Sequence, residues 1–240
     1  MKKTWISKYV DKVVILNLKH RPDRLQESMV EFEKIGIADV VEPVEAIEHD
    51  MGIIGCTASH YELVKFAKNA GLKNILIFED DVNFHDDSKL VEEVIKSAFD
   101  TINKENLTPH MLYLGGNATH IHDGHDKSIP YHKQISKNLY QLGGCKTTHA
   151  YVIFESLYDT IIEGFENTQW IPSEFRGDMR LNIDFWYLSR IHHNREKFNI
   201  YGVYPAMAGQ RASHSDIENR LMDLNLFEKY NRLLETNGIG

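Results

Sequence analysis

Strand-length apolar runs alternate with amphipathic segments through the first half of the chain, and this alternation constrains the fold more than any other feature. The run KVVILNL (12–18) is nearly uniformly apolar, as expected of a strand covered on both faces. The next segment places apolar residues close to helical spacing, at Leu25, Met29, Phe32 and Ile35. Pro22 suits the first turn of that helix and Gly36 its end. The alternation predicts an α/β fold with a parallel or mostly parallel sheet.

The same kinds of pattern predict strands and helices along the rest of the chain. We expect strands at 39–46, 74–78, 110–116, 139–144, 148–154 and 198–205. We expect helices at 57–71, 86–104, 155–165 and 182–194, with a long loop at 117–138 and a helical segment at 215–235. The glycine-bearing segment MGIIGC (51–56) predicts a loop, and Ser59 and Glu62 have the spacing of a capping box, which favours a start of the second helix near residue 57.

The domain organisation follows from length and composition. A chain of 240 residues could form one large α/β domain or two small ones. No repeat and no Gly/Ser-rich linker divides it, so we predict a single domain over 1–240, with 216–240 as a helical C-terminal tail. The hydrophobic content of 42% and charged content of 26% are ordinary for a soluble protein.

Charge and cysteine usage limit the possible partners and compartments. The net charge of −8 argues against a surface built to hold nucleic acid. No window approaches the apolar length of a transmembrane helix or signal peptide, so we expect a cytoplasmic protein without an integral membrane segment. Cys56 and Cys145 lack metal-site spacing and are interpreted as small buried hydrophobes.

Three consecutive carboxylates, Glu79, Asp80 and Asp81, follow the predicted strand at 74–78. Adjacent carboxylates repel one another, so placing them at the end of a buried strand costs stability unless a cation lies there. A divalent metal is one such cation, and a solvated acidic turn is the alternative.

The carboxyl ends of parallel strands meet at one edge of an open sheet, where ligands gather. The loop after 12–18 brings the basic residues Lys19, His20, Arg21 and Arg24 to that edge, opposite the three acids. A basic edge facing an acidic edge can hold a metal bound to an anionic ligand such as a diphosphate.

Six motifs occur in the order and approximate spacing of the glycosyltransferases of family 25, over about residues 12–217: VVILNLKHRPDRL, GIIGCTASHYELV, ILIFEDDV, THAYVIF, NIDFWYL and VYPAMAGQRASHSDI. That family includes bacterial lipooligosaccharide β-galactosyltransferases and is similar to collagen hydroxylysine galactosyltransferases. The resemblance implies a GT-A (Rossmann-like nucleotide-binding) fold, a nucleotide-sugar donor, a divalent metal and inversion at the anomeric carbon. The metal would be Mn²⁺ or Mg²⁺.

The resemblance also implies roles for individual residues. Asp81 would be the first metal ligand and Asp80 the second, with Glu79 structural or bonded to the nucleotide. His214 is the candidate for completing the metal sphere, and a solvated loop histidine is the alternative. Asp184 would be the base that accepts the acceptor proton, although a carboxylate at a helix start is also favoured as a cap.

The remaining implied contacts concern the donor. Residues at the first strand end would lie beside the nucleoside, and four further side chains would contact the nucleotide or its phosphates: Asn17, Leu18, Arg21, Arg24, Gln210 and Arg211. The predicted function is transfer of a hexose, galactose or glucose, from a UDP-sugar to a hydroxyl acceptor on a glycan or other biomolecule. The alternative is a catalytically inactive protein of the same fold that binds a sugar or nucleotide or acts as an interaction protein.

Overall fold

An eight-stranded mixed sheet forms the centre of the computed structural model, which describes residues 3–167, 182–215, 220–222 and 226–237. The strand order is β2-β1-β3-β10-β5-β11-β8-β7. The bounds are Lys12–Asn17 (β1), Val41–Glu45 (β2), Asn74–Glu79 (β3), Met111–Tyr113 (β5), Lys133–Ser136 (β7), Leu139–Gln141 (β8), Ala150–Phe154 (β10) and Ile200–Val203 (β11).

Six of these eight strands run in one direction, and only β10 and β8 run against them. The predicted α/β class with a mostly parallel central sheet is therefore confirmed. Smaller two-stranded pairs lie outside the sheet: β4 (Val82–Phe84) with β12 (Ala208–Gln210), β6 (Asn117–Ala118) with β9 (Cys145–Lys146), and β13 (Ser213–Ser215) with β14 (Arg220–Met222).

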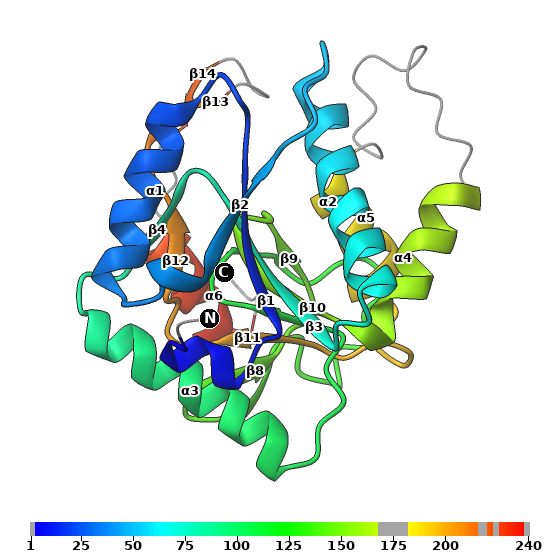
Figure 1. Ribbon diagram of the computed structural model, residues 1–240. Coiled ribbons are helices and arrows are strands. Elements are labelled where there is room, and N and C mark those ends of the chain that lie inside the picture. The colour runs from blue at the N-terminus through cyan, green and yellow to red at the C-terminus, as the bar shows by residue number, and fades with distance from the viewer. Residues whose placement is uncertain (1–2, 168–181, 216–219, 223–225, 238–240) are drawn as a thin grey trace.

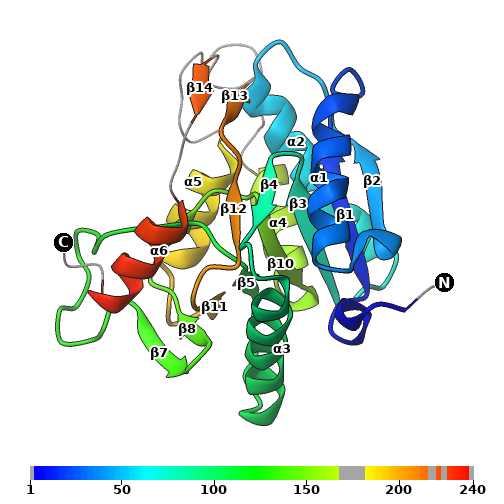
Figure 2. The ribbon, with the colours of Figure 1, turned by 90° about the vertical axis from the view of Figure 1, so that its left-hand side faces the viewer.

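Helices cover both faces of the sheet (Figure 1). On one side lie α1 (Pro22–Lys34) and α3 (Ser88–Lys104), and on the other lie α2 (Gly52–Asn69), α4 (Glu155–Asn167) and α5 (Ile183–Tyr187). A view turned by 90° places α1 and α3 in front of the sheet, with α6 (Leu226–Glu235) beside β12 (Figure 2). Among the described helices, none combines the length and hydropathy needed to cross a bilayer.

Alternate residues of the central strands belong to two separate cores. In β3, Ile75 and Ile77 point into the core formed with α2 and α4, whereas Leu76 and Phe78 point into the core formed with α1 and α3. All four side chains are at most 1% exposed. This two-sided burial explains why the strand is a continuous apolar run rather than an alternating one.

Helix α2 begins at Gly52 and therefore includes the segment that the sequence suggested was a loop before residue 57. The capping-box interpretation of Ser59 is wrong, because this residue lies within the helix. Its hydroxyl donates to the Gly55 carbonyl at 2.7 Å and accepts from the Ile47 amide at 2.8 Å. Gly55 is required there, since a Cβ would lie 2.3 Å from the Ile47 carbonyl oxygen.

Three other segments differ from the sequence expectations. The loop predicted over 117–138 contains β6 and β7 at its ends. The helix predicted over 182–194 is α5 followed by a π-helical turn, Leu188–His192. The helical tail predicted over 216–240 is helical at α6, whereas Arg220–Met222 pair with Ser213–Ser215. The division of the chain into one domain stays a prediction.

Truncating a side chain at the centre of the sheet should destabilise the protein. Ile77 is 0% exposed in β3, so we expect Ile77→Ala to lower the free energy of unfolding by about 2–5 kcal/mol in urea denaturation. The matched control Ile129→Ala, at a side chain that is 52% exposed, should change it by less than about 0.5 kcal/mol. Equal effects of the two variants would contradict the assignment of this core.

Candidate active site

The carboxyl ends of β1 and β3 lie side by side because these strands are parallel neighbours, with Leu16 opposite Glu79. The residues that follow are therefore brought together: the Asn17 amide nitrogen donates to an Asp80 carboxylate oxygen at 2.8 Å. The Asn17 amide also donates to the Arg21 carbonyl at 2.9 Å, which ties the strand end to the start of α1. The predicted meeting of the basic loop and the acidic strand end is thus present.

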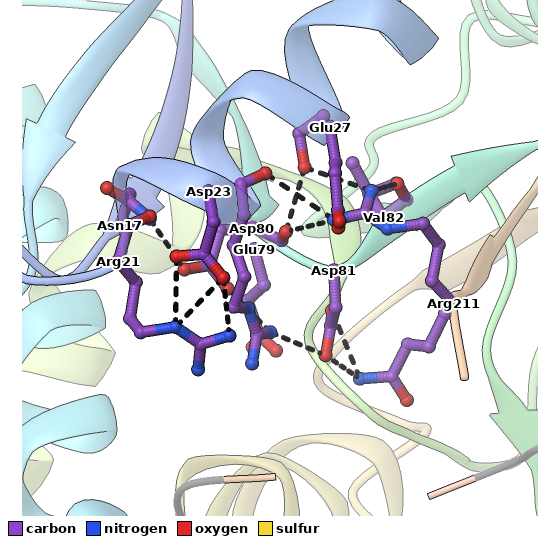
Figure 3. A network of polar contacts seen from close by, with 12 residues as sticks. Asn17, Arg21, Asp23, Glu27, Glu79, Asp80, Asp81, Val82 and Arg211 are labelled. Carbon is purple, nitrogen blue, oxygen red and sulfur yellow. Dashed lines mark hydrogen bonds and ion pairs between the residues drawn. The ribbon is translucent and has the colours of Figure 1, made fainter. Parts of the chain in front are cut away.

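Arg24, in the first turn of α1, makes direct ion pairs with two residues of the acidic cluster. Its guanidinium lies 2.6 Å from Asp80 and 3.1 Å from Asp81. The three side chains are only 9%, 13% and 16% exposed, so this is an almost fully desolvated contact. Arg21 instead pairs with Asp23 at 3.0 Å, at the outer side of the cluster (Figure 3).

The antiparallel β4–β12 pair delivers the last predicted motif to the same place. Its register sets Gln210 opposite Val82, and the Gln210 amide approaches the two oxygens of Asp81 at 3.4 and 3.5 Å. Arg211 donates to the carbonyls of Asp80 and Val82 at 2.6 and 2.7 Å (Figure 3). These contacts make Arg211 a support of the acidic turn, and its predicted contact with the donor stays a prediction.

Glu79 points to the other face of the sheet, toward α2. One of its oxygens lies 3.1 Å from His60 Nε2 and accepts from the Thr148 hydroxyl at 2.5 Å. His60 Nδ1 lies 2.8 Å from the Tyr151 hydroxyl. Burial alone would raise the pKa of Glu79, but the bonds from His60 and Thr148 hold it below its ordinary value.

Asp184 lies beyond this cluster, at the start of α5. The helix cap is Asn182, whose side chain accepts from the Asp184 amide at 3.2 Å, so the Asp184 carboxylate is not needed as the N-cap. That carboxylate accepts from the Thr147 amide at 3.2 Å. Thr147 has a φ of +70°, a costly conformation for a β-branched residue. Burial raises the pKa of Asp184.

A cavity of about 320 Å³ opens beside these groups. Its lining combines the strand ends with the segment after β2: Leu16, Leu18, His20, Arg24, Ala46, Ile47, Glu48, His49, Asp50, Gly52, Cys56, Glu79, Asp80, Asp81 and Gln210. Predicted donor residues Leu18, Arg24 and Gln210 therefore share one cavity with the three carboxylates. Apolar, acidic and basic groups in one concave site are the features of a polar-ligand site.

The predicted metal ligand His214 belongs to β13, opposite Leu221. Its side chain lies outside the described part of the chain, and its metal role stays a prediction.

Comparison with known families adds a decisive observation. The model of glycosyltransferase family 25 (LPS biosynthesis protein) matches residues 48–175, more than half of the 240-residue chain. The chain belongs to glycosyltransferase family 25. The resemblance inferred from the six motifs is confirmed, and so is the expectation that the protein is a glycosyltransferase. The matched range contains the acidic triplet and α2, while Asn17, Arg24 and Gln210 lie outside it.

Solved structures similar to this glycosyltransferase are distant. A197 from STIV matches with a TM-score of 0.41 and 13% identity over 89% of this chain and 94% of that chain. A glycosyltransferase involved in glycosylation of the major capsid of PBCV-1 matches with a TM-score of 0.49 and 11% identity, covering 87% and 96%. At these values the similarities carry no information on donor or acceptor. No curated protein matched the sequence.

The electrostatics of this family 25 site fit a divalent cation. Burial, and then repulsion from Glu79, raise the pKa of Asp81 to about 7 despite the nearby Arg24. Burial likewise raises the pKa of Asp80. The charges of Arg24 and, at Asp80, of Arg21 thus do not offset the burial and mutual repulsion of these carboxylates. Carboxylate oxygens are the ligands that Mg²⁺ and Mn²⁺ prefer.

Sequence reasoning missed several residues of this glycosyltransferase site. Thr147 carried no signal, and Thr148 stood only as the first residue of the THAYVIF motif, because only the antiparallel direction of β10 brings the segment before it to this edge. Cys56 lines the cavity rather than being a fully buried hydrophobe, while Cys145 is buried as expected. The available signal was the four-residue spacing of Cys56 and His60 within a helical pattern.

The raised pKa of Asp81 predicts a pH-dependent stability. In metal-free buffer the folded protein holds at Asp81 a proton that an unfolded aspartate has lost, so the contribution of Asp81 to the free energy of unfolding should fall as pH rises from about 4 to 7. Asp81→Asn removes the titrating group and with it this contribution to the pH dependence of stability. We expect its melting temperature to exceed that of the wild type by a few degrees at pH 8, but not at pH 4.

Asp86→Asn is the matched control for that measurement, because Asp86 is an exposed carboxylate in the next loop. Its difference from the wild type should not change with pH. A pH-independent difference for Asp81→Asn as well would show that Asp81 titrates normally.

Proposed function

We propose that this protein is a metal-dependent inverting glycosyltransferase that moves a hexose, galactose or glucose, from a UDP-sugar to a hydroxyl of a glycan or other biomolecule. The observation that carries the proposal is the buried Asp80–Arg24–Asp81 contact beside a cavity at the carboxyl edge of the sheet, in a chain of family 25. The LPS biosynthesis named in the family description supports a bacterial glycan as the acceptor. The two free cysteines suit the reducing cytoplasm.

In this proposal the strand ends hold the donor. Leu18 lines the cavity and would lie against the nucleoside, next to Asn17 at the end of β1. Arg24, with Arg21 at the rim, would contact the phosphates. Gln210 keeps the Asp81 carboxylate in place, and Arg211 holds the turn that carries it.

Asp81 and Asp80 would hold the divalent cation, with His214 as the candidate third ligand. A bound Mn²⁺ or Mg²⁺ would stabilise the negative charge that the leaving nucleoside diphosphate gains. Arg24 contacts both carboxylates. When the donor and the cation bind, its guanidinium would move toward the diphosphate or would neutralise the carboxylates together with the cation.

Asp184 would act as the base for a single displacement. Its carboxylate would accept the proton of the acceptor hydroxyl as the oxygen attacks the anomeric carbon from the face opposite the leaving group. The raised pKa makes the carboxylate a stronger base than an exposed aspartate, and the Thr147 amide fixes its orientation.

Donor binding should depend on Asp81. We expect one of a panel of nucleotide sugars to bind the wild type by calorimetry only with Mn²⁺ or Mg²⁺, and Asp81→Asn to weaken that binding at least tenfold, which is about 1.4 kcal/mol. Asp86→Asn should bind as the wild type does. If the folded wild type binds no nucleotide sugar with either metal, the alternative of a catalytically inactive interaction protein replaces this proposal.

Turnover should depend on Asp184 separately from binding. We expect Asp184→Asn to slow release of nucleoside diphosphate by roughly 10²- to 10⁴-fold, the usual contribution of a positioned base, with the donor Kd changed less than about threefold. Asn182→Ser, which keeps a capping side chain, is the control for local helix damage. Wild-type turnover in Asp184→Asn would assign the base to another residue.

A further inference from the structure

Next to the proposed donor site, a second group of side chains has the composition of a different metal centre. We propose that Cys56, His60 and Glu79 form a site for a thiophilic divalent cation of the zinc class, separate from the oxygen ligands Asp80 and Asp81. Among the described residues, these three are the group whose potential ligand atoms, a thiol sulfur, an imidazole nitrogen and a carboxylate oxygen, all lie within 4.8 Å of one another.

The backbone explains this convergence. Cys56 and His60 are four residues apart on α2, so their side chains lie on one face of the helix, one turn apart. Glu79 is the last residue of β3, the strand that this helix face covers. A helix face and a strand end are rigid supports. Small side-chain adjustments would bring the three ligand atoms to the zinc bond lengths of about 2.0–2.3 Å.

The surroundings orient the ligands. Tyr151 bonds His60 Nδ1 at 2.8 Å, which directs Nε2 toward Glu79 at 3.1 Å. The Thr148 hydroxyl bonds the same Glu79 oxygen at 2.5 Å. Metal-binding histidines nearly always have such a partner on the second ring nitrogen, and ligating carboxylates are likewise hydrogen-bonded. The His60 side chain is 0% exposed and therefore held in one orientation.

Access and charge are also suitable. Cys56 and Glu79 line the cavity, so an ion can reach them from solvent. Asp80 and Asp81 line the same cavity, and their negative charge attracts cations. Burial and the same carboxylates raise the pKa of the Cys56 thiol, so the metal itself must displace the thiol proton. Only the thiolate is a ligand, so binding would form the metal–sulfur bond and release the thiol proton to solvent.

The two sets of ligands select different metals. Sulfur and nitrogen donors favour zinc, whereas Asp80 and Asp81 offer only oxygen, which suits Mg²⁺ and Mn²⁺. Three protein ligands leave one tetrahedral position for water or another ligand, as in zinc sites that are not purely structural. Cation binding by Cys56, His60 and Glu79 does not depend on the identity of the donor or on the reaction.

Cobalt substitution tests this site directly, because a Co²⁺–thiolate bond gives a charge-transfer absorption that carboxylates and imidazole do not. We expect the wild type, purified without metal, to bind one equivalent of Co²⁺ with this absorption and to lose it when Zn²⁺ is added. Cys56→Ser and Cys56→Ala should lack the absorption and bind Zn²⁺ at least tenfold more weakly by calorimetry.

Two matched variants keep the result specific. Cys145→Ala removes the other cysteine, which is buried elsewhere, and should keep the absorption. Asp81→Asn should also keep it, so that failure of the proposed donor site would leave this result intact. No absorption in the folded wild type, or an absorption retained in both Cys56 variants, would overturn the proposal.

Discussion

The contact of Arg24 with Asp80 and Asp81 is the interaction on which the cavity at the carboxyl edge of the sheet depends. Two desolvated carboxylates repel each other, and Glu79 adds a third charge at the same strand end. Removing the guanidinium would leave these charges uncompensated, which typically costs roughly 3–5 kcal/mol. The contact does not offset the burial of Asp81 and its repulsion by Glu79, so the pKa of Asp81 stays raised. The site is therefore stable enough to form and electrostatically suited to bind a further cation.

The antiparallel strand β10 gives this site its second half. In a purely parallel sheet the start of a strand would lie at the edge opposite the site. Because β10 runs against β3, its preceding residues reach the carboxyl edge, where the His149 carbonyl accepts from the Glu79 amide at 3.0 Å. Thr148 then bonds Glu79, and Thr147 bonds Asp184. One short segment thus links the acidic strand end to the proposed base.

Local sequence was sufficient where one segment specifies its own structure. The apolar runs of β1 and β3 and the periodic segments of α1 and α3 were found nearly at their observed bounds, since each is buried on a regular face. The start of α2 was not found, because Gly52 and Gly55 suggested a loop. Gly55 is instead required for packing against Ile47, a contact between separate segments. The sequence predicts a helix where Arg220–Met222 forms a strand, because that strand depends on its pairing with Ser213–Ser215, which is a contact between separate segments.

The order of residues along the chain was enough to predict the α/β class, the family, and the meeting of a basic loop with an acidic strand end. These depend on residue order and on the rule that parallel strands end at one edge. The folded structure was needed to show that Arg24 contacts the acids, that Arg211 supports the turn through carbonyls, and that Cys56, His60 and Glu79 converge. Those facts depend on side-chain direction and on contacts between distant segments, and neither is encoded in the spacing of residues along the chain.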